Sequence, residues 1–218
     1  MRNFFAICSL LLLGLSSVEA AVIVQYPFTT DLNPSVLGTG VQSSSYDGSN
    51  LSNSYIGDDG YGNVLEAYPS LGSTSYGSAE TNNSFFSIAV TASGGNYLNL
   101  GTLQFEVGKG GNSDPRGYFI RSSVDGFASD LFSTLLPSGT QQAPGLQTID
   151  LSSLSIFQNL SSIDFRFYVF TPSPSGNSVD FRNLELSSSN LPEPSALLLM
   201  MIGGLYLAGR RASLKPLK

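Results

Sequence analysis

The chain has 218 residues, of which 41% are hydrophobic and only 12% charged, about half the charged share of an ordinary soluble domain. The 170 residues from 21 to 190 carry 14 acidic and five basic residues, a net charge of −9, which argues against nucleic acid as a partner. The chain has no His, no Trp and one Cys, Cys8, which excludes His-based triads and zinc sites built from His and Cys.

Residues 1–20 have the pattern of a secretory signal peptide. Arg2 gives a positive start, residues 4–15 are an apolar run, and Val18-Glu19-Ala20 offers small residues to a signal peptidase. Because twelve apolar residues are too few to span a bilayer, a retained anchor is disfavoured. We predict export with cleavage after Ala20, which leaves a domain without Cys and therefore without disulfides.

The segment 21–186 is predicted to be one domain made of β-strands, because apolar and polar residues alternate along it. The alternation is clearest at 161–170, with Phe165 and Phe167 on one face and Asp164 and Arg166 on the other. The other predicted strands are 22–28, 64–68, 85–90, 102–107, 117–124, 146–151 and 179–186. Seven to nine short strands separated by turn residues predict an all-β, antiparallel β-sandwich of the jelly-roll type. An immunoglobulin-type sandwich is the alternative.

The segment 38–78 is unusual in composition, with 8 Gly and 10 Ser. It also contains five tyrosines, which are candidate ligand-binding residues: Tyr46, Tyr55, Tyr61, Tyr68 and Tyr76. Because sugar rings stack on such flat side chains, one interpretation is a carbohydrate-binding surface. The other is a long surface loop whose tyrosines cover the edge of the sandwich.

Acidic residues offer candidate ligands for calcium. Asp58, Asp59 and Asn63 place hard oxygen atoms on a glycine-rich backbone, which suits Ca²⁺, although the spacing is not that of an EF-hand. The alternative is an ordinary turn built on Asp-Gly. Asp180 shares the sequence parity of Leu184, so it is a candidate to point inward towards a metal or a buried arginine unless a bulge shifts the strand.

Carboxylates are the remaining candidates for catalysis. A glycosidase needs only two acids a few ångströms apart, but the sequence does not show which acids converge. The glycine-rich run 108–111 lacks the spacing of a phosphate-binding loop. We therefore expect a non-catalytic domain that binds exopolysaccharide. The alternatives are a purely structural adhesion or matrix domain and, more remotely, a carboxylate-based enzyme acting on glycans.

The C-terminal part combines several features of a processed membrane anchor. In order they are a polar spacer at 187–190, Pro192-Glu193-Pro194, an apolar run at 196–209, and the basic pair Arg210 and Arg211. The two prolines keep their segment extended and open to an enzyme. The apolar run would rise about 21 Å as a helix, which is short for a bilayer core of about 30 Å. We predict a transmembrane helix there, with the basic pair in the cytoplasm.

This order of motif, helix and basic pair resembles the PEP-CTERM sorting signal of Gram-negative bacteria that make exopolysaccharide. The resemblance covers 191–214, although Leu191 stands where the family more often has Val and the helix is short. It implies that exosortase, a membrane Cys protease, recognises Pro192, Glu193 and Pro194, while Arg210 and Arg211 retain the precursor in the inner membrane. Removal of the tail would then deliver the domain to the cell surface or extracellular matrix.

The central domain has a resemblance of its own, to the lectin-like jelly-roll ectodomains found on PEP-CTERM tails. It is carried by the order of the segments 114–118, 121–127, 149–151, 165–168 and 179–184. Structural calcium is common in lectin-like sandwiches, so the resemblance also implies calcium as a candidate cofactor.

Overall fold

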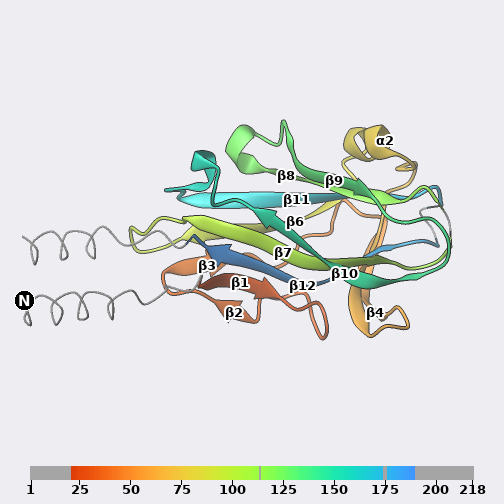
Figure 1. The fold of residues 1–218 in the computed structure, drawn as a ribbon, viewed down its shortest axis with the longest axis horizontal. Helices are drawn as coiled ribbons and strands as arrows, with labels where there is room; N and C mark the ends of the chain where they lie inside the picture. The colour runs from red at the N-terminus through yellow and green to blue at the C-terminus, as the bar shows by residue number, and fades with distance from the viewer. Residues whose placement is uncertain (1–20, 113, 174–175, 190–218) are drawn as a thin grey trace, which may run out of the picture. The chain divides into compact units, whose positions relative to one another are not determined.

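Two antiparallel β-sheets lie face to face in the computed structural model, which describes residues 21–112, 114–173 and 176–189 (Figure 1). The predicted jelly-roll β-sandwich is confirmed. The predicted signal peptide with Ala20, the motif Pro192-Glu193-Pro194 and the helix at 196–209 lie outside the described residues. Within the described ranges, no helix is long and apolar enough to cross a membrane.

The larger sheet has seven strands and the smaller sheet has five. The large sheet contains β1 (Val22–Tyr26), β2 (Val36–Leu37), β4 (Asn53–Asp58), β5 (Asn63–Tyr68), β7 (Leu100–Lys109), β10 (Gln142–Asp150) and β12 (Val179–Ser188). Its main path runs β10-β7-β12-β1-β2, and β5 joins β12 and β4. The small sheet runs β3 (Val41–Ser43), β6 (Phe85–Ala92), β11 (Ser162–Phe170), β8 (Gly117–Ser122) and β9 (Asp130–Leu135).

The core between the sheets is rich in phenylalanine. On β11, Phe165 and Phe167 are fully buried between the sheets, as the alternation predicts. Phe167 stacks on Phe86 of the neighbouring strand at 4.7 Å between ring centroids, with 3° between the ring planes. Across the sandwich it meets Phe105 and Phe181 edge-on. One aromatic cluster therefore joins the two sheets.

The segment 38–78 is more regular than a long loop. It contains β3, β4, β5 and the start of the short helix α2 (Tyr76–Thr81). The β4 strand is polar and lies at the edge of the large sheet, so it lacks the apolar alternation that would have predicted it. The edge strand β9 is likewise half-exposed. The interpretation of 38–78 as one long surface loop is therefore wrong.

A β-bulge in β12 decides where Asp180 lies. The register of β12 against β7 shifts between Arg182 and Glu185, and Asn183 has a φ of 50°. Odd-numbered residues of β12 therefore point into the core before the bulge, and even-numbered residues point into it afterwards. Asp180 consequently does not share the inward face of Leu184. Asp180 instead faces away from the core, although it is fully buried.

The short helix α2 covers one end of the outer face of the small sheet, on the side away from the large sheet, where it contacts β11 and β8 (Figure 1). Beneath it is a second apolar cluster of Ala79, Phe85, Phe119, Tyr168 and Phe170. The Arg121 guanidinium pairs with Glu80 and Asp130, each at 2.7 Å. The part of this face that lies under α2 is consequently buried.

Asp164 on the same sheet is expected to make the stability of the domain depend on pH. Burial raises the pKa of its carboxyl to about 6, the charge of Arg166 lowers it, and that of Asp47 raises it. The folded chain then holds this proton more tightly than the unfolded chain, so the free energy of unfolding falls as pH rises from about 4 to about 6. A fully buried group would account for about 3 kcal/mol, which partial exposure reduces to about 1–2 kcal/mol.

Asp164→Asn should remove this fall and stabilise the domain at pH 7 by about 1–2 kcal/mol. Urea unfolding at pH 4 and pH 7 measures the effect. Asp31→Asn, on an exposed turn, is the control and should change stability by less than about 0.5 kcal/mol. An Asp164→Asn protein with the wild-type dependence on pH would show that this carboxyl is well solvated.

Candidate functional site

A polar pocket of about 190 Å³ lies beside the end of the β4–β5 hairpin. Its walls include Asp58, Asp59, Glu66, Tyr68, Gln141 and Ser178. Glu66 and Tyr68 come from β5, while Ser178 lies directly before β12. We call this hollow the acidic pocket because three of these six residues carry a carboxyl group.

The turn between β4 and β5 places the first two acids. The Asp58 Oδ1 atom accepts hydrogen bonds from the backbone N–H groups of Gly60 and Gly62, at 2.8 and 3.3 Å. Both glycines have positive φ angles, 86° and 109°, which favour glycine over other residues. The Asp59 Oδ1 atom accepts from the Tyr61 N–H at 2.8 Å. This local network fixes Asp58 and Asp59 in the pocket wall.

Asp59 and Asp180 each keep one carboxylate oxygen without a partner. Asp59 is 6% exposed and Asp180 is 0% exposed, yet the Oδ2 atom of each makes no hydrogen bond. The other oxygen of Asp180 accepts from the Ser178 hydroxyl. The pKa of Asp180 is raised to about 7, mainly by burial. The charges of Asp59 and Glu66 also raise this pKa, while the Ser178 hydrogen bond and the charge of Arg116 lower it.

Two tyrosines form a flat surface at the rim of the pocket. The rings of Tyr55 and Tyr68 are stacked with centroids 5.7 Å apart and 22° between their planes. Their hydroxyls are 3.1 Å apart, and Tyr68 donates to Glu66 Oε2 at 2.5 Å. Burial and these hydrogen bonds raise the pKa of Tyr68, so its hydroxyl stays protonated at neutral pH. We call Tyr55 and Tyr68 the tyrosine platform.

The five candidate tyrosines do not form one surface. Tyr46 packs against the core residues Phe28 and Phe86, with centroids 5.9 and 5.2 Å away. Tyr76 lies on α2, over the other sheet. Tyr61 is 51% exposed and belongs to the turn that carries Asp58 and Asp59. Only Tyr55, Tyr61 and Tyr68 therefore accompany the acidic pocket.

The predicted calcium ligands are also separated in part. Asp58 and Asp59 line the acidic pocket, whereas Asn63 is not among its lining residues. The Asn63 side-chain amide donates to the Thr29 carbonyl at 2.7 Å. The lining of the pocket includes Glu66. Asp180, which is distant in sequence, lies opposite Glu66 because β12 pairs with β5.

Sequence reasoning missed several residues of this pocket, among them Glu66, Gln141 and Ser178. The glycine run 108–111 contained a usable signal. A Cβ atom on Gly110 would lie 2.7 Å from Ser178 Oγ and 3.3 Å from Asp180 Oδ2, so any other residue here would force the Ser178 side chain to shift. A glycine run beside an acidic strand can thus mark close backbone packing.

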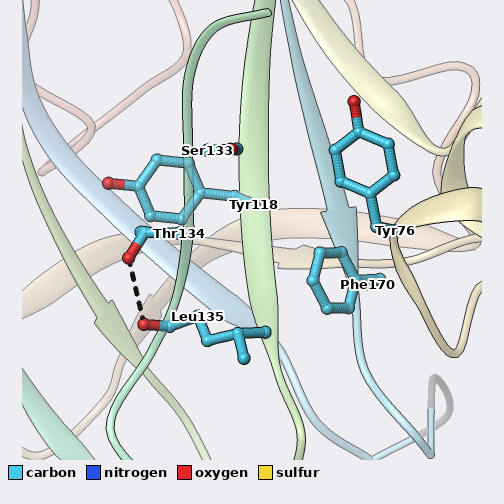
Figure 2. Close-up of a pocket in the computed structure, with 6 residues that line it drawn as sticks. All are labelled: Tyr76, Tyr118, Ser133, Thr134, Leu135 and Phe170. Carbon is cyan, nitrogen blue, oxygen red and sulfur yellow. Dashed lines mark hydrogen bonds between the residues drawn. The ribbon is translucent and has the colours of Figure 1, made fainter.

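A second hollow of about 220 Å³ lies between α2 and β9, and its lining is mostly apolar (Figure 2). Figure 2 shows Tyr76 and Phe170 on one side and the ring of Tyr118 on the other, directed away from them. The Tyr76 hydroxyl donates to Asp130 at 2.5 Å and accepts from Arg121 at 3.0 Å. The Tyr76 hydroxyl is therefore already hydrogen-bonded within the protein. The second hollow consequently has fewer polar groups that could bind sugar hydroxyls than the acidic pocket has.

Together the fold and this site define a jelly-roll β-sandwich with an acidic pocket and an adjacent tyrosine platform. No family model and no curated protein matches the sequence. Among solved structures, the chain is similar to the K3 cleaved adhesin domain of Lys-gingipain from Porphyromonas gingivalis, with TM-score 0.45 and 12% identity over 78% of this chain and 100% of that one.

Two further solved structures are similar to the chain. A family 11 carbohydrate-binding module from Clostridium thermocellum, in complex with a β-1,3-1,4-mixed-linked tetrasaccharide, matches with TM-score 0.38 and 16% identity over 78% of this chain and 98% of that one. A Stig cyclase from Fischerella matches with TM-score 0.36 and 17% identity over 81% of this chain and 91% of that one.

Proposed function

We propose that the sandwich is a non-catalytic, glycan-binding domain of an exported surface protein, and that its ligand is exopolysaccharide. The observation that carries this proposal is the tyrosine platform beside the acidic pocket. Tyr55 is 42% exposed, so its ring offers an apolar face to the C–H groups of a sugar. Glu66, Asp58 and Gln141 supply polar groups for sugar hydroxyls next to it.

The charge of the pocket favours an uncharged polysaccharide. Its wall carries three carboxyl groups, and a fourth lies buried in Asp180. A uronic acid or sulfated sugar would be repelled by these groups. A neutral sugar can instead donate its hydroxyl hydrogens to them.

The same geometry favours binding over catalysis. Asp180 has the raised pKa that a general acid needs, but its side chain is fully buried and cannot reach a sugar in the pocket. The other acids of the wall are held by the turn or by Tyr68. These contacts suit a fixed binding surface.

Loss of the tyrosine platform should weaken glycan binding strongly. We expect the full-length chain to bind neutral polysaccharides on a glycan array. Tyr55→Ala combined with Tyr68→Ala should weaken binding at least about tenfold, because losing two aromatic contacts of this kind costs about 1.4 kcal/mol or more. Tyr97→Ala is the matched control, since Tyr97 is 64% exposed and outside both hollows. If the double variant binds as tightly as the wild type, the glycan binds elsewhere on the chain. If neither protein binds, the domain has no glycan ligand on the array.

We further propose that exosortase sorts this protein. The support is the order of Pro192-Glu193-Pro194, the apolar run 196–209 and the pair Arg210 and Arg211. The precursor is then held in the inner membrane until its tail is cut on the outer side. The domain reaches the surface or the extracellular matrix without that tail.

Replacing Pro192, Glu193 and Pro194 by alanine should leave export intact and stop processing. The unprocessed protein should remain in the inner membrane, because the predicted signal peptide and apolar run are unchanged. Mass spectrometry of the C-terminus of surface material decides the matter, and we expect no Arg210 or Arg211 in wild type. Recovery of an intact Lys218 end from the surface would show that the tail is an ordinary anchor.

A further inference from the structure

The first and last residues of the sandwich meet at one of its ends. The Ser188 N–H donates to the Ala21 carbonyl at 2.8 Å, which joins the end of β12 to the start of β1. The Ser189 N–H donates to the Asn99 carbonyl at 2.8 Å, and the Ser189 hydroxyl donates to Gln158 Oε1 at 3.2 Å. We call this part of the sandwich the terminal end.

Two loops at the terminal end are bonded to each other. They are 93–99, which leads from β6 to β7, and 151–161, which leads from β10 to β11. Leu98 and Leu160 form a β-bridge between them, in which each backbone N–H donates to the other residue's carbonyl, at 2.8 and 3.0 Å. We call these two segments the terminal loops, and they form one continuous surface beside the chain ends.

The terminal loops expose large apolar side chains and carry no charge. Tyr97 is 64% exposed, Ile156 55% and Leu154 44%. Neither 93–99 nor 151–161 contains an Asp, Glu, Lys or Arg, although the domain as a whole has a net charge of −9. Exposed apolar side chains that gather on one part of a surface mark an interaction site.

The acidic pocket lies at the opposite end of the sandwich. Ser178 in its wall directly precedes β12, whereas Ser189 directly follows this strand of ten residues. The charged residue nearest in sequence to the terminal loops is Asp150, directly before the second loop. Because anionic lipids repel carboxylates, the terminal end can approach a membrane surface with less repulsion than the acidic pocket can.

The length of the chain after Ser189 keeps the domain close to its proposed anchor. Six residues, 190–195, separate Ser189 from the apolar run 196–209. An extended residue spans at most about 3.6 Å, so this spacer reaches about 20 Å. A strand of ten residues is longer than that, about 33 Å. The terminal end is therefore the part of the domain that a membrane-inserted tail would bring to the lipid.

We propose that the terminal loops contact the outer surface of the inner membrane while the precursor is anchored there, with Tyr97, Leu154 and Ile156 in the headgroup region. This inference rests on the proposed sorting of the protein. Tyrosine and aliphatic side chains on an uncharged surface suit the membrane interface. The acidic pocket would then point away from the membrane, towards polysaccharide outside.

The contact would be too weak to hold the domain without the tail. Even a single fatty acyl chain gives only marginal, reversible membrane binding, and three partly exposed side chains bury less apolar surface than such a chain. Cutting of the tail would therefore release the domain, and the terminal loops would orient the precursor only before processing.

A single introduced tryptophan can report this contact, because the chain has none of its own. The full-length Tyr97→Trp chain is reconstituted into phosphatidylcholine vesicles with or without brominated acyl chains, which quench tryptophan fluorescence on contact. Leu71→Trp is the matched control, since Leu71 is 87% exposed. Leu71 lies near the other end, because Ser73 accepts from the N–H of Thr171, directly after β11. Flotation of the vesicles shows separately that each chain is anchored.

We expect brominated lipid to lower the fluorescence of Tyr97→Trp at least about twofold and to leave that of Leu71→Trp unchanged. Adding Leu154→Ser and Ile156→Ser to Tyr97→Trp should reduce the quenching by about half or more, because serine does not favour the interface. Both positions are exposed, so the added serines should leave the fold intact, which circular dichroism verifies.

A floating Tyr97→Trp chain that is quenched no more than Leu71→Trp would overturn this inference and leave the proposed sorting intact. A chain that does not float with the vesicles would contradict both, because no anchor would then exist. Fluorescence that changes with protein concentration but not with brominated lipid would assign the terminal loops to a second copy of the chain, which also overturns the inference.

Discussion

Phe167→Ala should destabilise the domain by about 3–5 kcal/mol, the usual cost of removing a fully buried phenylalanine. Phe167 contacts Phe86 within its own sheet and Phe105 and Phe181 across the sandwich, so no single neighbour can fill the space left behind. Because domains of this size are stable by only about 5–15 kcal/mol, this is a large part of the total. Denaturant unfolding of the full-length chain measures the loss.

The control for this prediction is an aromatic ring that contributes nothing to the core. Tyr97→Ala should change the free energy of unfolding by less than about 0.5 kcal/mol, because Tyr97 is 64% exposed. A similar loss in the two variants would mean that the cluster around Phe167 is not the core of the sandwich.

Arg116→Met should be comparably damaging, at about 3–5 kcal/mol. The guanidinium is fully buried, and it donates to the Ser178 carbonyl at 2.7 Å and to Asn177 Oδ1 at 2.8 Å, as well as to the Gly110 carbonyl. Methionine fills much of the volume but leaves these acceptors without donors and removes the positive charge near Asp180. The loss is read from denaturant unfolding.

Arg182→Met gives the comparison. Arg182 pairs with Glu106 at 2.7 Å, but both side chains are partly exposed, so its removal should cost about 1 kcal/mol or less. If Arg116→Met is no worse than Arg182→Met, the buried guanidinium is not holding the loops around the acidic pocket in place.

The sandwich was predictable from the sequence because several core strands, β11 above all, alternate between apolar and polar residues. In β11 the inward Phe165 and Phe167 alternate with Asp164 and Arg166, and the structure keeps this arrangement without a bulge. The alternation is weak in β4, a half-exposed strand at the sheet edge in which Ile56 is the only aliphatic residue that packs against the core. Edge strands are therefore where sequence analysis was weakest.

The acidic pocket was predictable only in part. Asp58 and Asp59 are adjacent in the chain, so their shared turn could be recognised from the sequence alone. Asp180 is brought to them by the pairing of β12 with β5, and its orientation depends on a bulge further along the strand. Because strand register and bulges are set by tertiary packing, no local pattern in the sequence contains this convergence.

Covalent labelling of tyrosines, read by mass spectrometry with and without bound polysaccharide, tests the proposed glycan surface most directly. Tyr55, Tyr61, Tyr76 and Tyr97 are all exposed, so each reports on its own part of the surface. We predict that polysaccharide protects Tyr55 and Tyr61 at the acidic pocket and leaves Tyr76 and Tyr97 reactive. Protection of Tyr76 with unchanged labelling of Tyr55 would place the ligand at the apolar hollow beside α2 and contradict this account.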